Sequence, residues 1–284
     1  MTQFISEVSS NHHQDINRCL AFIDKSAEIG CDAVKFQLFK VRELFAPEAI
    51  QTNPKLAARE KWELPVSFLP ALKERCDAQD IAFACTPFYL EAVSQLHAYV
   101  DFFKIASYEL TWDALLRECG KTGKPVVLST GMATLDEISH AVRVIRNSGC
   151  EDLTLLHCVS GYPTPLEEAN LSVMGTLREQ FKCDVGWSDH SVSSDVLMRA
   201  IHRWEASAVE FHLDLDGEGA EYGAGHCWLP EQIEPIIRSS RLSSRIDGNK
   251  TKTVAASEAA DRDWRADPTD GLRPFRSMRA TLDK

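Results

Sequence analysis

The segment between residues 186 and 212 opens with Gly186-Trp187-Ser188-Asp189-His190 and closes with Ala208-Val209-Glu210-Phe211-His212. Each stretch is a short apolar run of the kind that a buried parallel strand needs, and each ends in a histidine. The residues between the two stretches are enough for one crossover helix. Parallel strands joined in this way end at the same edge of a sheet. His190 and His212 are therefore predicted to lie close together, either as two ligands of one metal ion or as two hydrogen-bonded, half-buried imidazoles.

The same alternation of strand and helix patterns runs through the rest of the chain. Apolar runs typical of buried strands occur at 4–8, 32–38, 81–86, 101–105, 125–129 and 153–158, before the two stretches quoted above. Segments with helical spacing separate them, and Thr134 with Glu137 matches a capping box. Eight strand and helix pairs in 284 residues predict a closed (β/α)8 TIM barrel of the α/β class. No Gly-x-Gly-x-x-Gly follows the first run, which disfavours an open dinucleotide-binding sheet.

Two segments are expected to be loops. A polar stretch runs from residue 40 to residue 65, and a polar, glycine-rich stretch follows His212 as far as Gly225. A last helix is predicted at 230–241, with proline in its first turn.

Composition restricts the class of partner. The formal net charge of −11 disfavours nucleic acid, because a phosphate backbone requires basic surface. No apolar run is long enough to cross a membrane and no leader pattern precedes the first strand, so we expect a cytoplasmic protein with no membrane partner. The nine cysteines form no Cys-x-x-Cys pair, and we interpret them as reduced thiols that mostly pack in the core.

Polar side chains gather at the carboxyl ends of the predicted strands, where barrel enzymes place their active sites. They are Glu7, Lys35, Gln37, Thr86, Lys104, Ser107, Glu109, Ser129, Thr130, Ser160, Tyr162, Ser188, Asp189, His190 and His212. Lys35 and Lys104 interrupt apolar runs, and a buried lysine needs a charge partner or loses its proton. Either lysine alone is explained by a rim position or a glutamate partner. Both together, among hydroxyl donors, predict a site for a small multiply charged anion such as a phosphate ester with a carboxylate.

Two carboxylates complete this set of strand-end residues. Glu7 and Glu109 are candidates for binding sugar hydroxyls or for moving protons. For Glu7 the alternative is a structural ion pair with Lys35. From the residues alone, the sequence predicts a metal ion and a small anionic substrate at one barrel mouth.

Motifs at the strand ends resemble those of the sialic acid synthase family, the phosphoenolpyruvate-dependent nonulosonate synthases. In chain order they are Glu7-Val8-Ser9-Ser10-Asn11-His12, Asp32-Ala33-Val34-Lys35-Phe36-Gln37, Lys104-Ile105-Ala106-Ser107, Leu128-Ser129-Thr130-Gly131-Met132-Ala133-Thr134, Leu156-His157-Cys158, Tyr162-Pro163, Gly186-Trp187-Ser188-Asp189-His190 and Glu210-Phe211-His212. The resemblance covers roughly residues 1–240.

The resemblance implies a transferase that condenses phosphoenolpyruvate with an N-acyl-hexosamine aldehyde, usually N-acetylmannosamine, to a nonulosonic acid and phosphate. A divalent ion, Mn²⁺ or Mg²⁺, would be held by His190 and His212 and would polarise the aldehyde oxygen. The residues matched to phosphoenolpyruvate binding are Lys35, Thr86, Lys104, Ser107, Ser129 and Ser188, with Ser160 at a position where many relatives carry asparagine. Those matched to the sugar are Glu7, Gln37, Glu109 and Tyr162. Among them Glu109 is the first choice for proton handling, by positioning the water that attacks C2, and a homodimer is implied.

The chain departs from the family pattern in two places. The aspartate of a Gly-Pro-Asp loop, which contacts the sugar in relatives, falls near Gly223 here, so that contact is missing or is supplied by Glu221 or His226. The family's C-terminal antifreeze-like domain, which lends an arginine to the partner subunit's site, is also missing.

The chain is therefore divided into a catalytic barrel domain at 1–245 and a polar tail at 246–284. Charge and glycine-proline content make a disordered end one interpretation of the tail. Its aromatic residues favour the other, a tail that packs over its own or a partner's barrel mouth. In that arrangement Arg265 or Arg273 replaces the missing arginine.

Two other functions stay open at this point. One is a phosphoenolpyruvate-dependent condensing enzyme that acts on a phosphorylated or different aldose, which would need a second basic cluster. The other is a non-catalytic barrel that binds a sugar. The presence of Lys35, Lys104, His190 and His212 together argues against the second.

Overall fold

The computed structural model describes residues 1–282, apart from the side chain of Ser244, so the last two residues of the expected tail lie outside it. The chain forms two compact units, Met1–Arg241 and the segment from Leu242 onward. The first unit holds all the strands found in the described residues.

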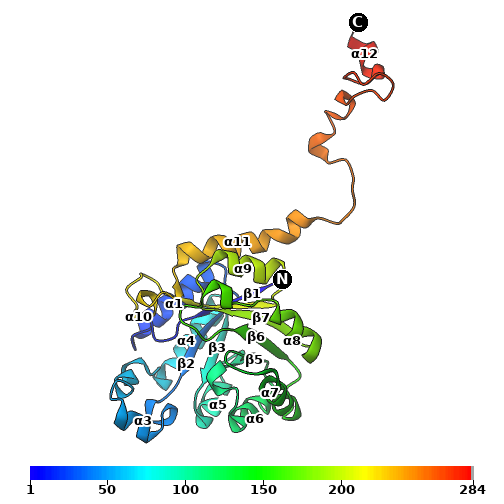
Figure 1. Cartoon of the computed structure of the whole chain (residues 1–284). Helices are drawn as coiled ribbons and strands as arrows, with labels where there is room; N and C mark the ends of the chain where they lie inside the picture. The colour runs from blue at the N-terminus through cyan, green and yellow to red at the C-terminus, as the bar shows by residue number, and fades with distance from the viewer. Residues whose placement is uncertain (283–284) are drawn as a thin grey trace. The chain divides into compact units, whose positions relative to one another are not determined.

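Eight parallel strands form a closed barrel with helices around it (Figure 1). Neighbouring strands pair in sequence order, and β1 also pairs with β8, which closes the sheet. The strands are β1 (Gln3–Glu7), β2 (Ala33–Leu38), β3 (Ala82–Pro87), β4 (Phe102–Ile105), β5 (Val126–Ser129), β6 (Leu153–Cys158), β7 (Asp184–Asp189) and β8 (Ala208–Leu213). The predicted (β/α)8 TIM barrel is confirmed.

The crossover helices cover the outside of the barrel. They are α1 (Ile16–Glu28), α4 (Leu69–Ala78), α5 (Leu90–His97), α6 (Asp113–Gly120), α7 (Leu135–Asn147), α8 (Val173–Phe181), α9 (Ser194–His202) and α11 (Pro230–Asp247). The predicted capping box of α7 is present, because the backbone N–H of Glu137 donates to Thr134 Oγ1 and the Glu137 carboxylate accepts from the backbone N–H of Thr134.

Inside the barrel an apolar layer supports the polar mouth. It is a core cluster separate from the larger core and contains Ile5, Ala33, Val127, Leu156 and Ala208. Alternate residues of a strand share a face, so the residues two positions further along each strand point into the same interior, nearer the carboxyl ends. Those residues are Glu7, Lys35, Ser129, Cys158 and Glu210. The floor is therefore apolar and the layer above it is polar.

The two segments expected to be loops contain short elements. Helices α2 (Val41–Leu44) and α3 (Pro47–Thr52) and 3₁₀ turns η1 (Ala57–Trp62) and η2 (Val66–Phe68) lie within or beside the first segment. The second contains helix α10 (Ala220–Gly223) and is followed by β9 (Cys227–Trp228), which pairs with β8. The predicted loop therefore contains one short helix, and pairing of β9 with β8 holds the chain just beyond its end at Gly225.

The last predicted helix is also longer than expected. Helix α11 continues past residue 241 to Asp247, although Pro235 lies inside it. The segment from Leu242 onward contains three further short elements, η5 (Ala256–Glu258), η6 (Arg262–Trp264) and α12 (Arg276–Leu282). Within it Asp267 accepts hydrogen bonds from the backbone N–H groups of Thr269 and Arg276, and the Arg265 guanidinium lies 5.0 Å from the centre of the Phe275 ring.

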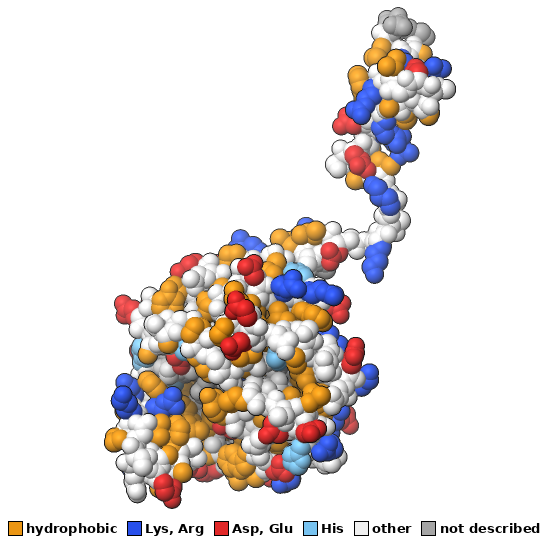
Figure 2. Space-filling model, in the orientation of Figure 1, with side chains coloured by type: hydrophobic (Ala, Val, Ile, Leu, Met, Phe, Trp, Pro, Cys, Tyr) orange, Lys and Arg blue, Asp and Glu red, His pale blue; other side chains and the backbone are white. Residues whose placement is uncertain are grey.

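The distribution of surface charge and the state of the cysteines agree with what the composition predicts. Figure 2 shows acidic and basic side chains interspersed on the visible face of the barrel, with no extended basic patch among the residues drawn there. All nine cysteines are free thiols, and eight of them are buried. Among residues 1–282, no helix has the length and apolar character to cross a membrane.

Candidate active site at the barrel mouth

Strand register brings the predicted residues of β1, β2 and β8 side by side. Glu7 pairs in register with Lys35 on one side and with His212 on the other, and Gln37 pairs with Thr86. The polar ends of these strands therefore form one continuous surface at the mouth.

Two buried lysines share a network with two buried glutamates. Lys35 Nζ lies 2.6 Å from Glu7 Oε2 and 3.8 Å from Glu210 Oε2, and Lys104 Nζ lies 3.6 Å from Glu210 Oε1. Lys35 Nζ also donates to Thr86 Oγ1 at 3.2 Å. The two glutamates thus provide negative charge next to two lysines whose side chains are only 4% and 2% exposed, which makes burial of the lysines tolerable.

The pKa values in this network follow from burial and pairing. Burial disfavours the charged form of Lys35, but Glu210 and Glu7 more than offset it, so the Lys35 pKa is raised. For Lys104 burial is the larger effect, and its pKa is lowered despite Glu210. Burial also opposes the Glu210 carboxylate, yet Lys104 and Lys35 lower its pKa. Glu210 is therefore the anion that both lysines share.

Hydroxyl groups surround the lysines. Ser188 Oγ donates to Glu210 Oε1 at 3.0 Å, and Ser107 Oγ accepts from the backbone N–H of Gly131 at 2.9 Å. The buried Oγ atoms of Ser129 and Ser160 have no hydrogen-bond partner among the described residues. A Cβ atom on Gly131 would lie 2.3 Å from Ser160 Oγ, so glycine lets these loops approach closely. Buried hydroxyls without partners indicate a place where a ligand supplies them.

Glu109, on the 3₁₀ turn η3 (Ser107–Glu109), has the properties of an acid or base. Its side chain is buried and its Oε2 has no hydrogen-bond partner among the described residues. Burial raises its pKa to about 7, although the charge of Lys104 acts in the opposite direction. A carboxyl group that titrates near neutral pH is suited to proton transfer.

Glu7 forms the ion pair with Lys35 that the sequence suggested as its structural role. Besides Lys35, it accepts from Gln37 Nε2, which lies 2.5 Å from Glu7 Oε1, and Gln37 Nε2 also donates to Ser9 Oγ at 3.3 Å. Glu7 and Gln37 are thus held together, and Gln37 is the more exposed of the two.

His190 and His212 lie close together, as predicted. The ring centres of His190 and His212 are 5.3 Å apart. His190 Nδ1 lies 2.9 Å from the carbonyl oxygen of Val159, so Nδ1 carries the hydrogen and Nε2 is left free. Burial, reinforced by His212, lowers the His190 pKa to about 3, which keeps the ring neutral. The ring of Tyr162 lies 4.1 Å from that of His190.

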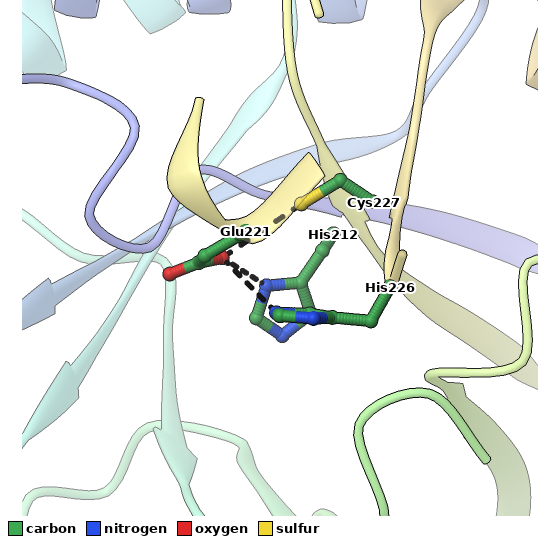
Figure 3. Close-up of side chains that lie close together, drawn as sticks. All are labelled: His212, Glu221, His226 and Cys227. Atoms are coloured by element: carbon green, nitrogen blue, oxygen red, sulfur yellow. Dashed lines mark hydrogen bonds and ion pairs between the residues drawn. The ribbon is translucent and has the colours of Figure 1, made fainter. Parts of the chain in front are cut away.

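A second group of donors adjoins His212 (Figure 3). Glu221 Oε2 lies 2.8 Å from His212 Nδ1, 3.7 Å from His226 Nε2 and 3.8 Å from Cys227 Sγ. Burial opposes both charges of the His212 and Glu221 pair, but each partner stabilises the other, so the His212 pKa is raised and the Glu221 pKa is lowered. Imidazole, carboxylate and thiol are all ligands of divalent ions, so the mouth offers more metal donors than the two predicted histidines.

Several of these residues were not predicted. Glu210 has a signal in the sequence, because it precedes His212 by two positions and so shares its face of the strand. The sequence suggests Glu221 and His226 only as sugar contacts and Cys227 only as a packing thiol. Their spacing follows neither the period of a strand nor that of a helix. Arg265 and Arg273 belong to the unit that begins at Leu242, so their part in the site stays a prediction.

Comparison with known proteins places the chain among synthases. The model of the NeuB family matches residues 22–252. N,N'-diacetyllegionaminic acid synthase of Campylobacter jejuni is 34% identical over 272 residues, which are 90% of this chain and 80% of that protein. An uncharacterised protein of Methanocaldococcus jannaschii is 35% identical over 266 residues, 90% of this chain and 75% of that one.

A solved structure agrees with these sequences. The N-acetylneuraminic acid (sialic acid) synthetase of Leptospira borgpetersenii, in complex with citrate, has a TM-score of 0.80 and 29% identity, and the match covers 92% of this chain and 90% of that one. The resemblance read from the strand-end motifs is confirmed.

Proposed function

Because the chain belongs to the NeuB family of enzymes, we propose that it condenses phosphoenolpyruvate with an N-acyl-hexosamine or a related aldose to give a nonulosonic, sialic-acid-like acid and phosphate. The observation that carries this proposal is the pair of buried lysines, Lys35 and Lys104, at the same end of the barrel as the hydroxyls of Ser129 and Ser160, which have no hydrogen-bond partner among the described residues. A site with these donors suits a small anion with both a phosphate and a carboxylate.

Lys104 has N–H donors that remain available to bind such an anion. An ammonium group carries three hydrogens, and the structure gives Lys104 Nζ one hydrogen bond, to the carbonyl oxygen of Ile105 at 3.2 Å. Its distance to Glu210, 3.6 Å, is longer than a hydrogen bond. We assign phosphoenolpyruvate to Lys35, Thr86, Lys104, Ser107, Ser129, Ser160 and Ser188.

The proposed reaction joins C3 of phosphoenolpyruvate to the aldehyde carbon. Water adds to C2, the bond from C2 to the phosphate oxygen breaks, and a ketone and phosphate result. We assign to Glu109 the role of holding that water and accepting its proton, because burial raises the Glu109 pKa to about 7. A divalent ion, Mn²⁺ or Mg²⁺ by resemblance, would be held by His190 and His212 and would polarise the aldehyde oxygen.

The sugar is assigned to the exposed side of the mouth. Glu7, Gln37 and Tyr162 are the proposed contacts, and the Tyr162 side chain is 43% exposed beside His190. We further propose that the tail from residue 246 contributes Arg265 or Arg273 to the same substrate, in its own subunit or in a homodimer. A cytoplasmic location suits an enzyme that draws on metabolic phosphoenolpyruvate.

Phosphate release tests the function. Phosphoenolpyruvate is incubated with a panel of free and phosphorylated aldoses, with Mn²⁺ and separately with a chelator. Release that needs an N-acyl-hexosamine and stops with the chelator supports the proposal. Release with phosphorylated aldoses alone favours the other condensing reaction, and no release with any acceptor favours a sugar-binding barrel. Release that persists with the chelator rules out the role of the metal.

A further inference from the structure

Four potential metal ligands converge just after the last barrel strand, and three of them lie outside the predicted histidine pair. They are His212, Glu221, His226 and Cys227, and one ligand atom from each lies within 4.8 Å of the other three (Figure 3). His212 is the second-last residue of β8, Glu221 lies in α10, and Cys227 begins β9. One short segment of chain thus returns to His212 with three donors.

The separations suit a single ion. Bonds of about 2.0–2.3 Å to nitrogen, oxygen and sulfur place two ligands of a tetrahedral ion about 3.5 Å apart. Glu221 Oε2 is 3.7 Å from His226 Nε2 and 3.8 Å from Cys227 Sγ. Its distance to His212 Nδ1 is the shorter 2.8 Å of a hydrogen bond, which a metal would replace. The donors therefore need only small shifts to surround a cation.

His226 gives independent evidence of a missing ligand. The residue is 8% exposed, and its Nδ1 has no hydrogen-bond partner among the described residues. Its Nε2 faces Glu221 at 3.7 Å, which is longer than a hydrogen bond. A buried nitrogen without a hydrogen bond is costly, so the unpartnered Nδ1 indicates that a group is missing beside this ring.

The group is held in place by the barrel itself. Register pairing of β8 with β9 sets Cys227 beside His212. Ser9 Oγ and Ser10 Oγ donate to Glu221 Oε1 at 2.6 Å and 2.8 Å, which leaves Oε2 directed at the other donors. Ligands fixed by strand pairing and by hydrogen bonds of this kind are preorganised for binding.

We propose that Glu221, His226 and Cys227 join His212 as ligands of a divalent cation, in a site that this chain builds from the segment after β8. A thiolate and two imidazoles select softer cations, so we expect Zn²⁺, Co²⁺ or Fe²⁺ to bind in preference to Mg²⁺. The role of this ion in polarising an aldehyde rests on the proposed function, whereas its binding does not.

Cobalt spectroscopy on the full-length protein tests the ligand set without turnover. Co²⁺ is added to metal-free protein in the absence of substrates, and the near-ultraviolet band of a cobalt–thiolate bond is recorded. We expect the band in the wild type and its loss in Cys227→Ser. Glu221→Gln and His226→Ala should weaken Co²⁺ binding by about tenfold or more. His190→Ala should weaken Co²⁺ binding but keep the band, because the thiolate that produces the band is that of Cys227.

Matched variants separate ligation from general damage. Cys183→Ser, Glu218→Gln and His202→Ala remove the same groups elsewhere in the barrel unit and should leave the titration unchanged. A wild-type complex without the thiolate band overturns the proposal, and this result needs no variant to fold. So does Co²⁺ affinity that is lost in His190→Ala but kept in His226→Ala and Cys227→Ser, which is the pattern of an ion on the two histidines alone. If cobalt binds as proposed but phosphate is never released, the metal site stands and the proposed function fails.

Discussion

Lys35 and Glu7 form an ion pair of 2.6 Å between neighbouring strands, with side-chain exposures of only 4% and 1%. Removing one partner of a buried pair leaves the other charge without compensation, which costs about 3–5 kcal/mol. We therefore expect Lys35→Met and Glu7→Gln each to lower the free energy of unfolding by several kcal/mol, measured by urea denaturation.

The double variant separates stability from function. Lys35→Met/Glu7→Gln should recover much of the lost stability, because no unpaired charge remains, but should not recover phosphoenolpyruvate-dependent phosphate release. The exposed pair Lys25–Glu28 is the matched control, and its neutralisation should leave both readouts unchanged. Additive effects of the two buried substitutions on stability would contradict the pairing.

Glu109 predicts a pH dependence with opposite signs for activity and stability. Burial raises its pKa from 4.5 to about 7, so a base at this position becomes competent as the pH rises through about 7, and kcat/KM should rise with it. The folded protein binds a proton that the unfolded chain releases above pH 4.5, so the same group lowers stability by about 3 kcal/mol as the pH rises to 7.

The variant Glu109→Gln tests both effects. It should lower kcat by about 10²–10⁴ and flatten both pH profiles. Glu118→Gln, on α6, where the glutamate side chain is 45% exposed, should preserve them. An unchanged pH profile of kcat/KM in Glu109→Gln would remove the carboxyl from the mechanism.

Ser129 and Ser160 should affect stability and substrate binding differently. Their buried hydroxyls have no partner among the described residues, so Ser129→Ala and Ser160→Ala remove an unsatisfied group and should leave Tm unchanged or raise it. The same variants should raise the KM for phosphoenolpyruvate by about tenfold, since each loses one hydrogen bond to the anion.

A serine with a partner in the fold is the control. Ser6 Oγ is 2.6 Å from Ser26 Oγ in the core, so Ser6→Ala should lower Tm and leave the KM for phosphoenolpyruvate unchanged. Identical behaviour of all three variants would mean that Ser129 and Ser160 are ordinary packing residues.

The extent to which the sequence predicts this protein depends on the kind of contact. Apolar runs such as Leu153–Cys158 predict strands because a parallel strand buried on both faces needs them. Once the strands are ordered, their ends must meet, so Lys35, Lys104, His190 and His212 are predicted at one mouth. The positions of these residues follow from the regular strands of the fold.

Contacts made by irregular segments were not predictable in the same way. Glu210 reaches Lys104 across the barrel interior, a distance set by closure of the barrel rather than by spacing along the chain. Glu221 and Cys227 reach His212 only because α10 and β9 order a glycine-rich segment, and no period of apolar residues marks either element. Such a site is visible only in three dimensions.

Gly186 on β7 is the position in the quoted stretch where a side chain cannot fit. A Cβ atom there would lie 2.2 Å from the carbonyl oxygen of Ala208 and 2.7 Å from Leu156 Cδ2. A backbone oxygen in the barrel wall cannot move aside, so Gly186→Ala should destabilise the protein by about 3 kcal/mol or prevent folding. Gly223→Ala is the control, since its Cβ would meet no described atom within 4 Å, and should leave the urea midpoint nearly unchanged.

The tail offers the last test, which concerns the sugar rather than the anion. The segment from residue 246 contains Arg265 and Arg273, and the guanidinium of Arg265 is already ordered over Phe275. If the tail completes the sugar site, truncation after Asp247, at the end of α11, should raise the KM for the aldose by about tenfold or more and leave that for phosphoenolpyruvate unchanged. Arg265→Ala and Arg273→Ala identify which arginine contributes, and Arg262→Ala in η6 is the control. Because Lys35 and Lys104, which we assign to the anion, lie in the barrel unit, a rise in both KM values would indicate damage to the barrel, and unchanged kinetics would exclude the tail from the site.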